Sequence, residues 1–234
     1  MKVLAFDATA SLVTVGLAED GRSLGRWDAP AKRTRGNVLE GLIDRALATA
    51  DWSRQQIDGL ALVLGPGSLT ATRIGWATAA GWAQAADIPL VGWSTVAVQT
   101  RYWTQAVSSE ERPYWNGKDR LLCLVHRRGD EFYCYSLAPG GSGKQPEIVV
   151  LGATEPPPLS YAFLVGPGVL GYRQRWLDIL APGTRLVEDA HAVVGGDTLA
   201  IWGHEALVAG HSLSPEESPL DYGLPPDFRR HHRS

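Results

Sequence analysis

The sequence predicts an α/β protein of two lobes that are built on one plan. Short apolar strands alternate with helical segments along the chain, as in open sheets that are covered by helices. A polar stretch without periodicity divides the chain after residue 103, and a Gly-Pro-Gly turn lies between a strand and a helix on each side of it. We therefore expect a first lobe over residues 1–103 and a second lobe with a C-terminal tail over residues 104–234.

The first lobe is predicted to begin with three short strands within Met1–Pro30, because this stretch holds three apolar or alternating runs. Apolar residues then recur at helical spacing in Gly36–Ala50. A second helix has Ser68 or Thr70 as its cap and extends to about Ala86. The other elements of this lobe are strands at 57–65 and 88–93 and a helix from residue 95.

The second lobe follows Thr104–Asp119, which is polar and is predicted as a linker. Its strands are expected at 120–128, 130–138, 146–152 and 161–166, and its helices at 169–180 and 198–210. The last helix comes just before a proline-rich tail, so it is free to pack back on the first lobe.

An internal echo supports the duplication. Leu62–Leu69 reads LVLGPGSL and Phe163–Leu170 reads FLVGPGVL. Each segment has three apolar residues, Gly-Pro-Gly, one further residue and Leu, and each lies between a predicted strand and a predicted helix. Two halves with the same architecture explain this match.

Composition limits the class of protein. Hydrophobic residues make up 44% of the chain and charged residues 20%, with a net charge of −3, which is typical of a globular protein without a strong nucleic-acid surface. The one basic cluster is Arg229–Ser234, which is expected to be a solvated terminus. Cys123 and Cys134 are expected to be buried thiols in a reducing cytosol, which predicts a cytoplasmic protein. No stretch of about 20 apolar residues exists that could span a membrane.

Asp7 is a candidate ligand for a hydrated magnesium ion and a phosphate. It ends an apolar strand and is followed by the hydroxyls of Thr9 and Ser11. The alternative is an aspartate that hydrogen-bonds its own turn. The sequence alone leaves both open.

The turn from Gly65 to Ser68 is the second candidate for nucleotide binding. Gly65 and Gly67 would let the backbone approach a phosphate, and the helix that Ser68 caps would favour an anion. However, no lysine follows as in a P-loop, and Pro66 lacks an N–H. We therefore favour a tight strand-to-helix turn, with at most a vestigial nucleotide site.

The helix from Leu69 to Ala86 is the most informative segment, because its only charged residue is Arg73. A helix that is apolar on all sides must be covered on all sides. One face can lie on its own sheet, and the other suits a helix of a partner. Burial under the second lobe is the alternative. The predicted docking surface consists of Ala71, Gly75, Thr78, Ala79, Trp82 and Ala86, with Leu39, Leu42 and Ile43 of the preceding helix.

No catalytic constellation emerges from the sequence. The six histidines lack the spacing of metal ligands, and none lies in the first 125 residues. His126 ends a predicted strand, where it either faces a cleft or lies on the surface. We therefore predict no catalytic residue and no metal site.

At this point the motifs resemble a known family. LAFDATASLVTVGL, LVLGPGSLTATRIGWATAAGWA and PLVGWSTV, which span Leu4–Val96, are similar to the motifs of the TsaB family, also called YeaZ. The resemblance implies an actin-like ATPase (ASKHA) fold with two ribonuclease-H-like lobes. The second half fits more loosely, and Thr34, His126 and the segment PLDYGLPP depart from the family pattern.

The resemblance also implies a function. Members are non-catalytic accessory subunits in the threonylcarbamoyl modification of adenosine 37 of tRNA. They pair through first-lobe helices with the catalytic subunit TsaD, act with the ATPase TsaE, and meet tRNA only indirectly. A homodimer is expected when the partner is absent, and a nucleotide or magnesium ion at the interface is left open. The alternative is an active ATPase or small-molecule kinase of this fold, with Asp7 on magnesium and Gly195 and Gly196 near the adenosine.

Overall fold

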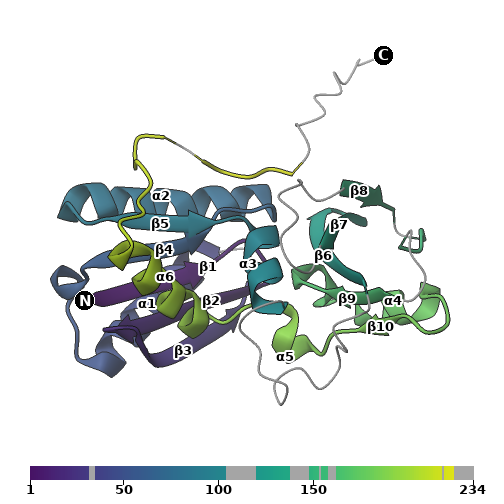
Figure 1. The fold of residues 1–234 in the computed structure, drawn as a ribbon, viewed down its shortest axis with the longest axis horizontal. Helices are drawn as coiled ribbons and strands as arrows, with labels where there is room; N and C mark the ends of the chain where they lie inside the picture. The colour runs from purple at the N-terminus through teal and green to yellow at the C-terminus, as the bar shows by residue number, and fades with distance from the viewer. Residues whose placement is uncertain are drawn as a thin grey trace.

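The computed structural model describes residues 1–31, 35–103, 120–137, 148–152, 154–157, 162–217 and 219–223. These residues form two five-stranded sheets, each with helices of its own (Figure 1). One sheet comes from the N-terminal half of the chain and the other from the C-terminal half, which is the two-lobed α/β architecture that the sequence predicts. The predicted linker at Thr104–Asp119 lies outside the described residues.

The first sheet has the strand order β3-β2-β1-β4-β5. Its central strand β1 (Lys2–Asp7) pairs antiparallel with β2 (Leu12–Glu19), which pairs antiparallel with β3 (Arg22–Pro30). On its other side β1 pairs parallel with β4 (Gly59–Val63), which pairs parallel with β5 (Leu90–Trp93). These are the five strands that we predicted for this lobe.

The second sheet repeats this plan. Its order is β8-β7-β6-β9-β10, with β6 in the central position that β1 occupies in the first sheet. The pairs β6–β7 and β7–β8 are antiparallel, and β6–β9 and β9–β10 are parallel. The same five-strand topology therefore occurs twice, which confirms the duplication. The strands are β6 (Arg120–Arg128), β7 (Glu131–Leu137), β8 (Ile148–Leu151), β9 (Ala162–Val165) and β10 (Arg185–Leu186).

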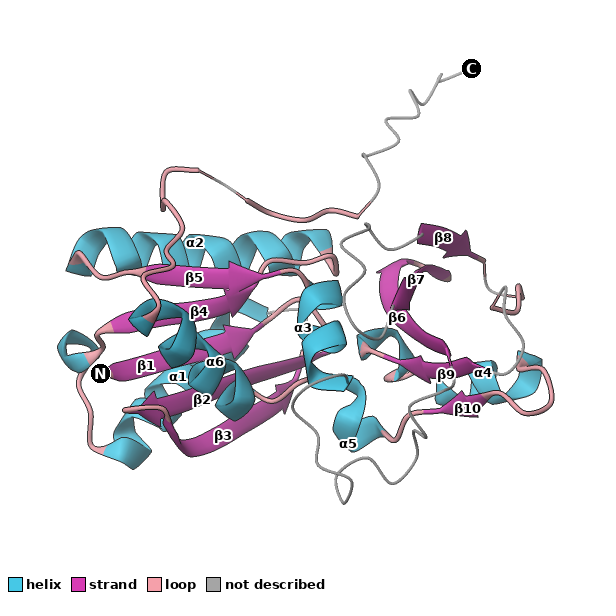
Figure 2. Ribbon diagram, viewed as in Figure 1, coloured by secondary structure: helices cyan, strands magenta, loops and turns pink. Residues whose placement is uncertain are grey.

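Side chains of the first sheet point alternately into two cores, because successive residues of a strand face opposite ways. Phe6 lies in the core beneath α1 (Arg35–Ala50) and α2 (Leu69–Ala86). Ala5 lies in the core beneath α6 (Gly196–Val208). Helices α1 and α2 therefore cover one face of the sheet, and α6 covers the other (Figure 2).

Glycines allow α6 to approach the sheet closely. A Cβ atom on Gly16 of β2 would overlap the backbone of Gly196, at the start of α6. The N–H of Gly196 donates a hydrogen bond of 2.8 Å to the hydroxyl of Thr14. Gly195 and Gly196, which the alternative function placed near an adenosine, thus form the contact between α6 and the first sheet.

Helix α3 (Thr95–Arg101) lies between the two lobes. Val98 packs in the first lobe, in the core beneath α6, whereas Val96 belongs to the core of the second lobe. Trp103, just after this helix, is 2% exposed and also packs in the second-lobe core. Helix α3 and Trp103 therefore pack against the cores of both lobes.

The C-terminal part of the second lobe differs from the prediction. The helix predicted at 169–180 begins with a 3-10 turn at Pro167–Val169, and its α-helical part, α4, is limited to Arg173–Ile179. Strand β10 and α5 (Asp189–Ala192) follow, where we predicted no element. Elements of two to four residues are too short to show a period in the sequence.

Candidate functional site

Asp7 hydrogen-bonds its own turn. It is 5% exposed, and its Oδ1 accepts the backbone N–H and the hydroxyl of Thr9, both at 2.7 Å. These are the hydrogen bonds of the turn-forming alternative. Ser11 is exposed and lies beyond this turn.

The Gly65–Ser68 turn joins β4, α2 and α3. Gly65 has a φ of +96°, which favours glycine, and its carbonyl accepts the N–H of Thr95 at 2.6 Å. A Cβ on Gly67 would lie 2.6 Å from the carbonyl oxygen of Thr9, and the N–H of Ser68 donates to that oxygen at 3.0 Å. The N–H of Ser68, the N-cap of α2, is thus used within the fold.

A cavity of about 200 Å³ lies where the two lobes meet. It is smaller than the range of about 300–1,000 Å³ that is usual for small-molecule sites. The predicted residues Thr9, Ser11, Gly67 and Ser68 line it, but Asp7 and Gly65 do not. The second lobe contributes Val125, His126, Pro167, Leu170 and Tyr172. The cavity therefore brings together only part of the predicted nucleotide site.

His126 lines this cavity. The sequence left open whether this residue faces a cleft or lies on the surface. Its Nε2 lies 2.8 Å from the carbonyl of Gly129 and 3.1 Å from the hydroxyl of Tyr172, on whose ring it stacks at 5.3 Å. The internal repeat holds a signal for this position. Gly67 packs on Thr9 and, in the second lobe, Gly168 packs on Leu124. His126 is therefore the counterpart of Ser11, two residues further along each lobe.

The predicted docking surface on α1 and α2 requires a correction. Leu39, Leu42, Ile43, Ala71 and Ala79 are at most 6% exposed and lie within the first lobe. Gly75 is also buried, and a Cβ added there would lie 3.7 Å from the ring of Phe6. These residues are covered within the chain itself, where α2 packs mainly on strand β4 of its own sheet.

The opposite side of α2 is exposed and nearly uncharged. Thr78 and Trp82, from the predicted surface, are partly exposed, and Ala86 is exposed. Leu69, at the start of the helix, is 51% exposed. The other exposed residues of α2 are Thr70, Arg73, Ala77, Gly81, Gln84 and Ala85. We call this side of α2, together with the exposed side of α1, the docking face. The exposed residues of α1 are Asn37, Gly41, Asp44, Arg45, Ala48 and Thr49.

Two glycines on the docking face have no role in the fold. Gly41 of α1 and Gly81 of α2 are both exposed, and a Cβ atom on either would meet no atom within 4 Å. A glycine inside a helix costs about 0.5–1 kcal/mol relative to alanine. No neighbouring atom of the described residues requires a glycine at either position.

Arg54 links the two helices at one edge of this face. Its guanidinium donates to Asp44 at 2.7 Å and to Glu40 at 2.8 Å, and it lies 5.0 Å from the ring centre of Trp82. The hydrogen bonds to Asp44 and Glu40 raise the pKa of Arg54 above its usual value. The position of Trp82 is thereby tied to α1.

The comparisons with known proteins agree with this architecture. The family model for TsaD, tRNA N6-adenosine threonylcarbamoyltransferase, matches residues 30–128. The tRNA threonylcarbamoyladenosine biosynthesis protein TsaB of Escherichia coli is 30% identical over 133 residues, which cover 57% of this chain and 53% of that protein. An uncharacterized protein of Mycobacterium tuberculosis is 31% identical over 196 residues, which cover 77% of this chain and 88% of that protein. The chain is therefore similar to proteins of the TsaB (YeaZ) family.

Two solved structures are similar in fold to this chain. YeaZ from Pseudomonas aeruginosa has a TM-score of 0.64 at 22% identity, over 94% of this chain and 99% of that one. The activator of 2-hydroxyisocaproyl-CoA dehydratase from Clostridium difficile, with bound ADPNP, has a TM-score of 0.51 at 8% identity, over 90% of this chain and 97% of that one. These similarities concern the fold alone, which is the actin-like fold that the resemblance implied.

Two further findings concern the described residues of this chain. Across them, no helix is both long and apolar enough to cross a bilayer. In the same part of the chain, no three side chains of His, Cys, Asp or Glu gather into a possible metal site. The chain spans about half the length of the Escherichia coli relative that it matches, at 53%.

Proposed function

We propose that the chain is a non-catalytic accessory subunit in the threonylcarbamoyl modification of tRNA, and that it binds a TsaD-type catalytic subunit through the docking face. The two exposed glycines are the observation that supports this proposal best. Gly41 and Gly81 leave the backbones of α1 and α2 uncovered, and on the α2 side of this surface the only charged residue is Arg73. Small residues at such positions let two helices approach each other closely, so a helical partner accounts for their cost.

The match to the TsaD family model supports this choice of partner. The matched residues 30–128 contain α1 and α2, so a TsaD-type protein is expected to have two similar helices on its own first lobe. Related surfaces can pack about a pseudo-twofold axis, as in an isologous dimer. The same geometry accounts for a homodimer of this chain when the partner is absent.

The interlobe cavity supports a non-catalytic role over an ATPase or kinase. The Asp7 carboxylate and the N–H of Ser68 are used in the turn around Thr9. The remaining cavity of about 200 Å³ is below the usual size for a small-molecule site. We further propose that the chain acts in the cytoplasm, that a TsaE-type ATPase joins the complex, and that tRNA is contacted only indirectly.

Light-scattering chromatography with the TsaD-type subunit of the same organism tests this function. We expect a one-to-one complex with the wild-type chain and none with Gly81→Arg, because the long charged side chain would enter the interface. Val208→Arg is the matched control: Val208 is 65% exposed on α6, which covers the opposite face of the sheet. A wild-type chain that forms no complex would overturn the function. Equal weakening by both variants would overturn the docking face.

A further inference from the structure

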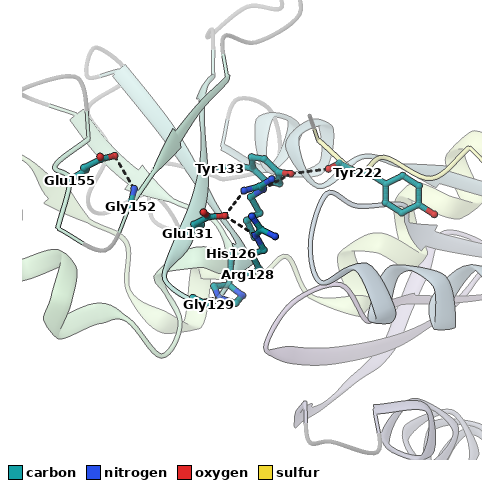
Figure 3. A network of polar contacts seen from close by, with 9 residues as sticks. His126, Arg128, Gly129, Glu131, Tyr133, Gly152, Glu155 and Tyr222 are labelled. Carbon is teal, nitrogen blue, oxygen red and sulfur yellow. Dashed lines mark hydrogen bonds and ion pairs between the residues drawn. The ribbon is translucent and has the colours of Figure 1, made fainter. Parts of the chain in front are cut away.

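The segment Leu220–Gly223, which we call the clasp, bonds to both lobes. The N–H of Asp221 donates to the carbonyl of Leu64, just after β4 in the first lobe, at 2.9 Å. The carbonyl of Tyr222 accepts the hydroxyl of Tyr133, from β7 in the second lobe, at 3.1 Å (Figure 3). The chain thus returns from α6 to the junction of the lobes and bridges it.

The clasp fits its surroundings closely. A Cβ atom on Gly65 would overlap the carbonyl oxygen of Asp221. Gly223 has a φ of +75°, and a Cβ on it would lie 2.9 Å from the ring of Tyr133. The N–H of Gly223 donates to Oδ1 of Asp221 at 2.8 Å, which closes a turn. Glycines on both sides of the contact therefore permit it.

The side chain of Tyr222 points to a third element. The guanidinium of Arg73, on the docking face of α2, lies 5.8 Å from the centre of the Tyr222 ring, and its Nε lies 3.5 Å from the hydroxyl. Tyr222 is 37% exposed. One residue thus contacts the second lobe through its backbone and α2 through its side chain.

The second lobe holds Tyr133 in a fixed orientation. The Nε of Arg127 donates to the Tyr133 hydroxyl at 3.2 Å, so that hydroxyl accepts one hydrogen bond and donates the other to the clasp. Arg127 and Arg128 both donate to Glu131, on the same hairpin. Figure 3 shows Arg128 beside Glu131. These hydrogen bonds orient the Tyr133 hydroxyl toward the clasp.

We propose that the clasp is a conformational device that couples the docking face of α2 to the second lobe. When it is closed, the N-terminal end of α2, the turn after β4 and strand β7 are held in one arrangement. When it opens, the contacts of Tyr222 with Arg73 and with Tyr133 are lost together. The device belongs to the chain itself and would operate whatever partner the docking face binds.

Hydrogen exchange of the Asp221 amide in the full, unbound chain tests the coupling, because that N–H is released only when the clasp opens. We expect Tyr133→Phe to accelerate this exchange about fivefold, the equivalent of one hydrogen bond. Arg73→Ala should accelerate it about two- to fivefold, as expected for an exposed cation–π contact.

Two control variants make the test specific. Gln174→Ala removes a hydrogen bond of the second lobe, from Gln174 to Asp178 within α4, in which no residue of the clasp takes part. Gln84→Ala alters α2 near its other end. Neither should change the exchange of Asp221. Acceleration by both Tyr133→Phe and Arg73→Ala supports the coupling. If either variant exchanges at the wild-type rate, or if a control matches it, the coupling is refuted. Binding of a TsaD-type subunit is not part of this readout, so the two proposals fail separately.

Discussion

Gly81→Ala should stabilise the free chain and weaken its complex. Gly81 lies in the middle of α2 with open space where a Cβ would be, so the methyl group creates no clash in the free chain. The gain expected from helix propensity is about 0.5–1 kcal/mol. For a chain of this size, that corresponds to an increase in Tm of about 1–4 °C.

In the complex the sign reverses, because the methyl group enters a close contact between helices. Inserting one methyl group into a well-packed contact costs about 1–3 kcal/mol, which is a loss in affinity of about 5- to 150-fold. Differential scanning calorimetry of the free chain and titration calorimetry with the TsaD-type subunit measure the two effects separately.

Gly203→Ala is the matched control. Gly203 is also inside a helix, but a Cβ there would lie 2.7 Å from the Cβ of Ala61, so this change should lower the Tm of the free chain. The reasoning is refuted if Gly81→Ala lowers Tm as Gly203→Ala does. It is equally refuted if Gly81→Ala raises Tm and leaves the affinity for the partner unchanged.

Three further predictions follow from the described contacts. Gly75→Glu should lower the Tm by about 10 °C or more, or prevent folding, because it buries an unpaired carboxylate against Phe6. Thermal unfolding followed by circular dichroism measures this effect. A soluble variant with the wild-type Tm would contradict the burial of Gly75. The hydrogen bond from Arg128 holds the pKa of Glu131 below its usual value, so its stabilising effect is complete above about pH 4.5 and is lost as the pH falls through the lowered pKa. Glu131→Gln should therefore lower the Tm at pH 7 and lose this effect once the pH is below the lowered pKa. An equal effect at neutral and at acidic pH would exclude the ion pairs as the cause. Burial raises the pKa of the Cys134 thiol to about 12, and it also raises the pKa of the Cys123 thiol. Neither thiol should therefore react with a thiol reagent until the chain unfolds. Rapid labelling of the native chain would contradict this prediction, because it would show that the thiols are accessible.

The strands and long helices could be predicted because their patterns are local. The alternation in β2 and the helical spacing in α1 each identify an element within one stretch of chain. The Gly-Pro-Gly echo even identified the duplication, because Gly67 and Gly168 approach the central strand of each sheet in the same way. Such close contacts leave a sequence signal that does not depend on the rest of the fold.

The side of α2 that is exposed could not be predicted, since both sides consist of small or apolar residues. Ala71, Gly75 and Ala79 are buried, whereas Ala77 and Gly81 are exposed, and no difference in hydrophobicity separates the two sets. The position of the adjacent sheet decides which side is covered. The contacts of His126 and of Tyr222 are likewise non-local, because they join residues from separate parts of the chain.

Both lobes contribute support to the proposed docking face. If the docking face acted alone, the first lobe would be sufficient, because α1, α2 and α6 all pack on its sheet. However, α3 and the clasp both cross the junction, and the clasp bonds to β7 at the point where it also touches α2. The second lobe therefore supports the N-terminal end of α2 through the clasp. A partner that binds along α2 would meet a surface held by both lobes, so loss of the second lobe should weaken docking even though none of its residues lies on the docking face.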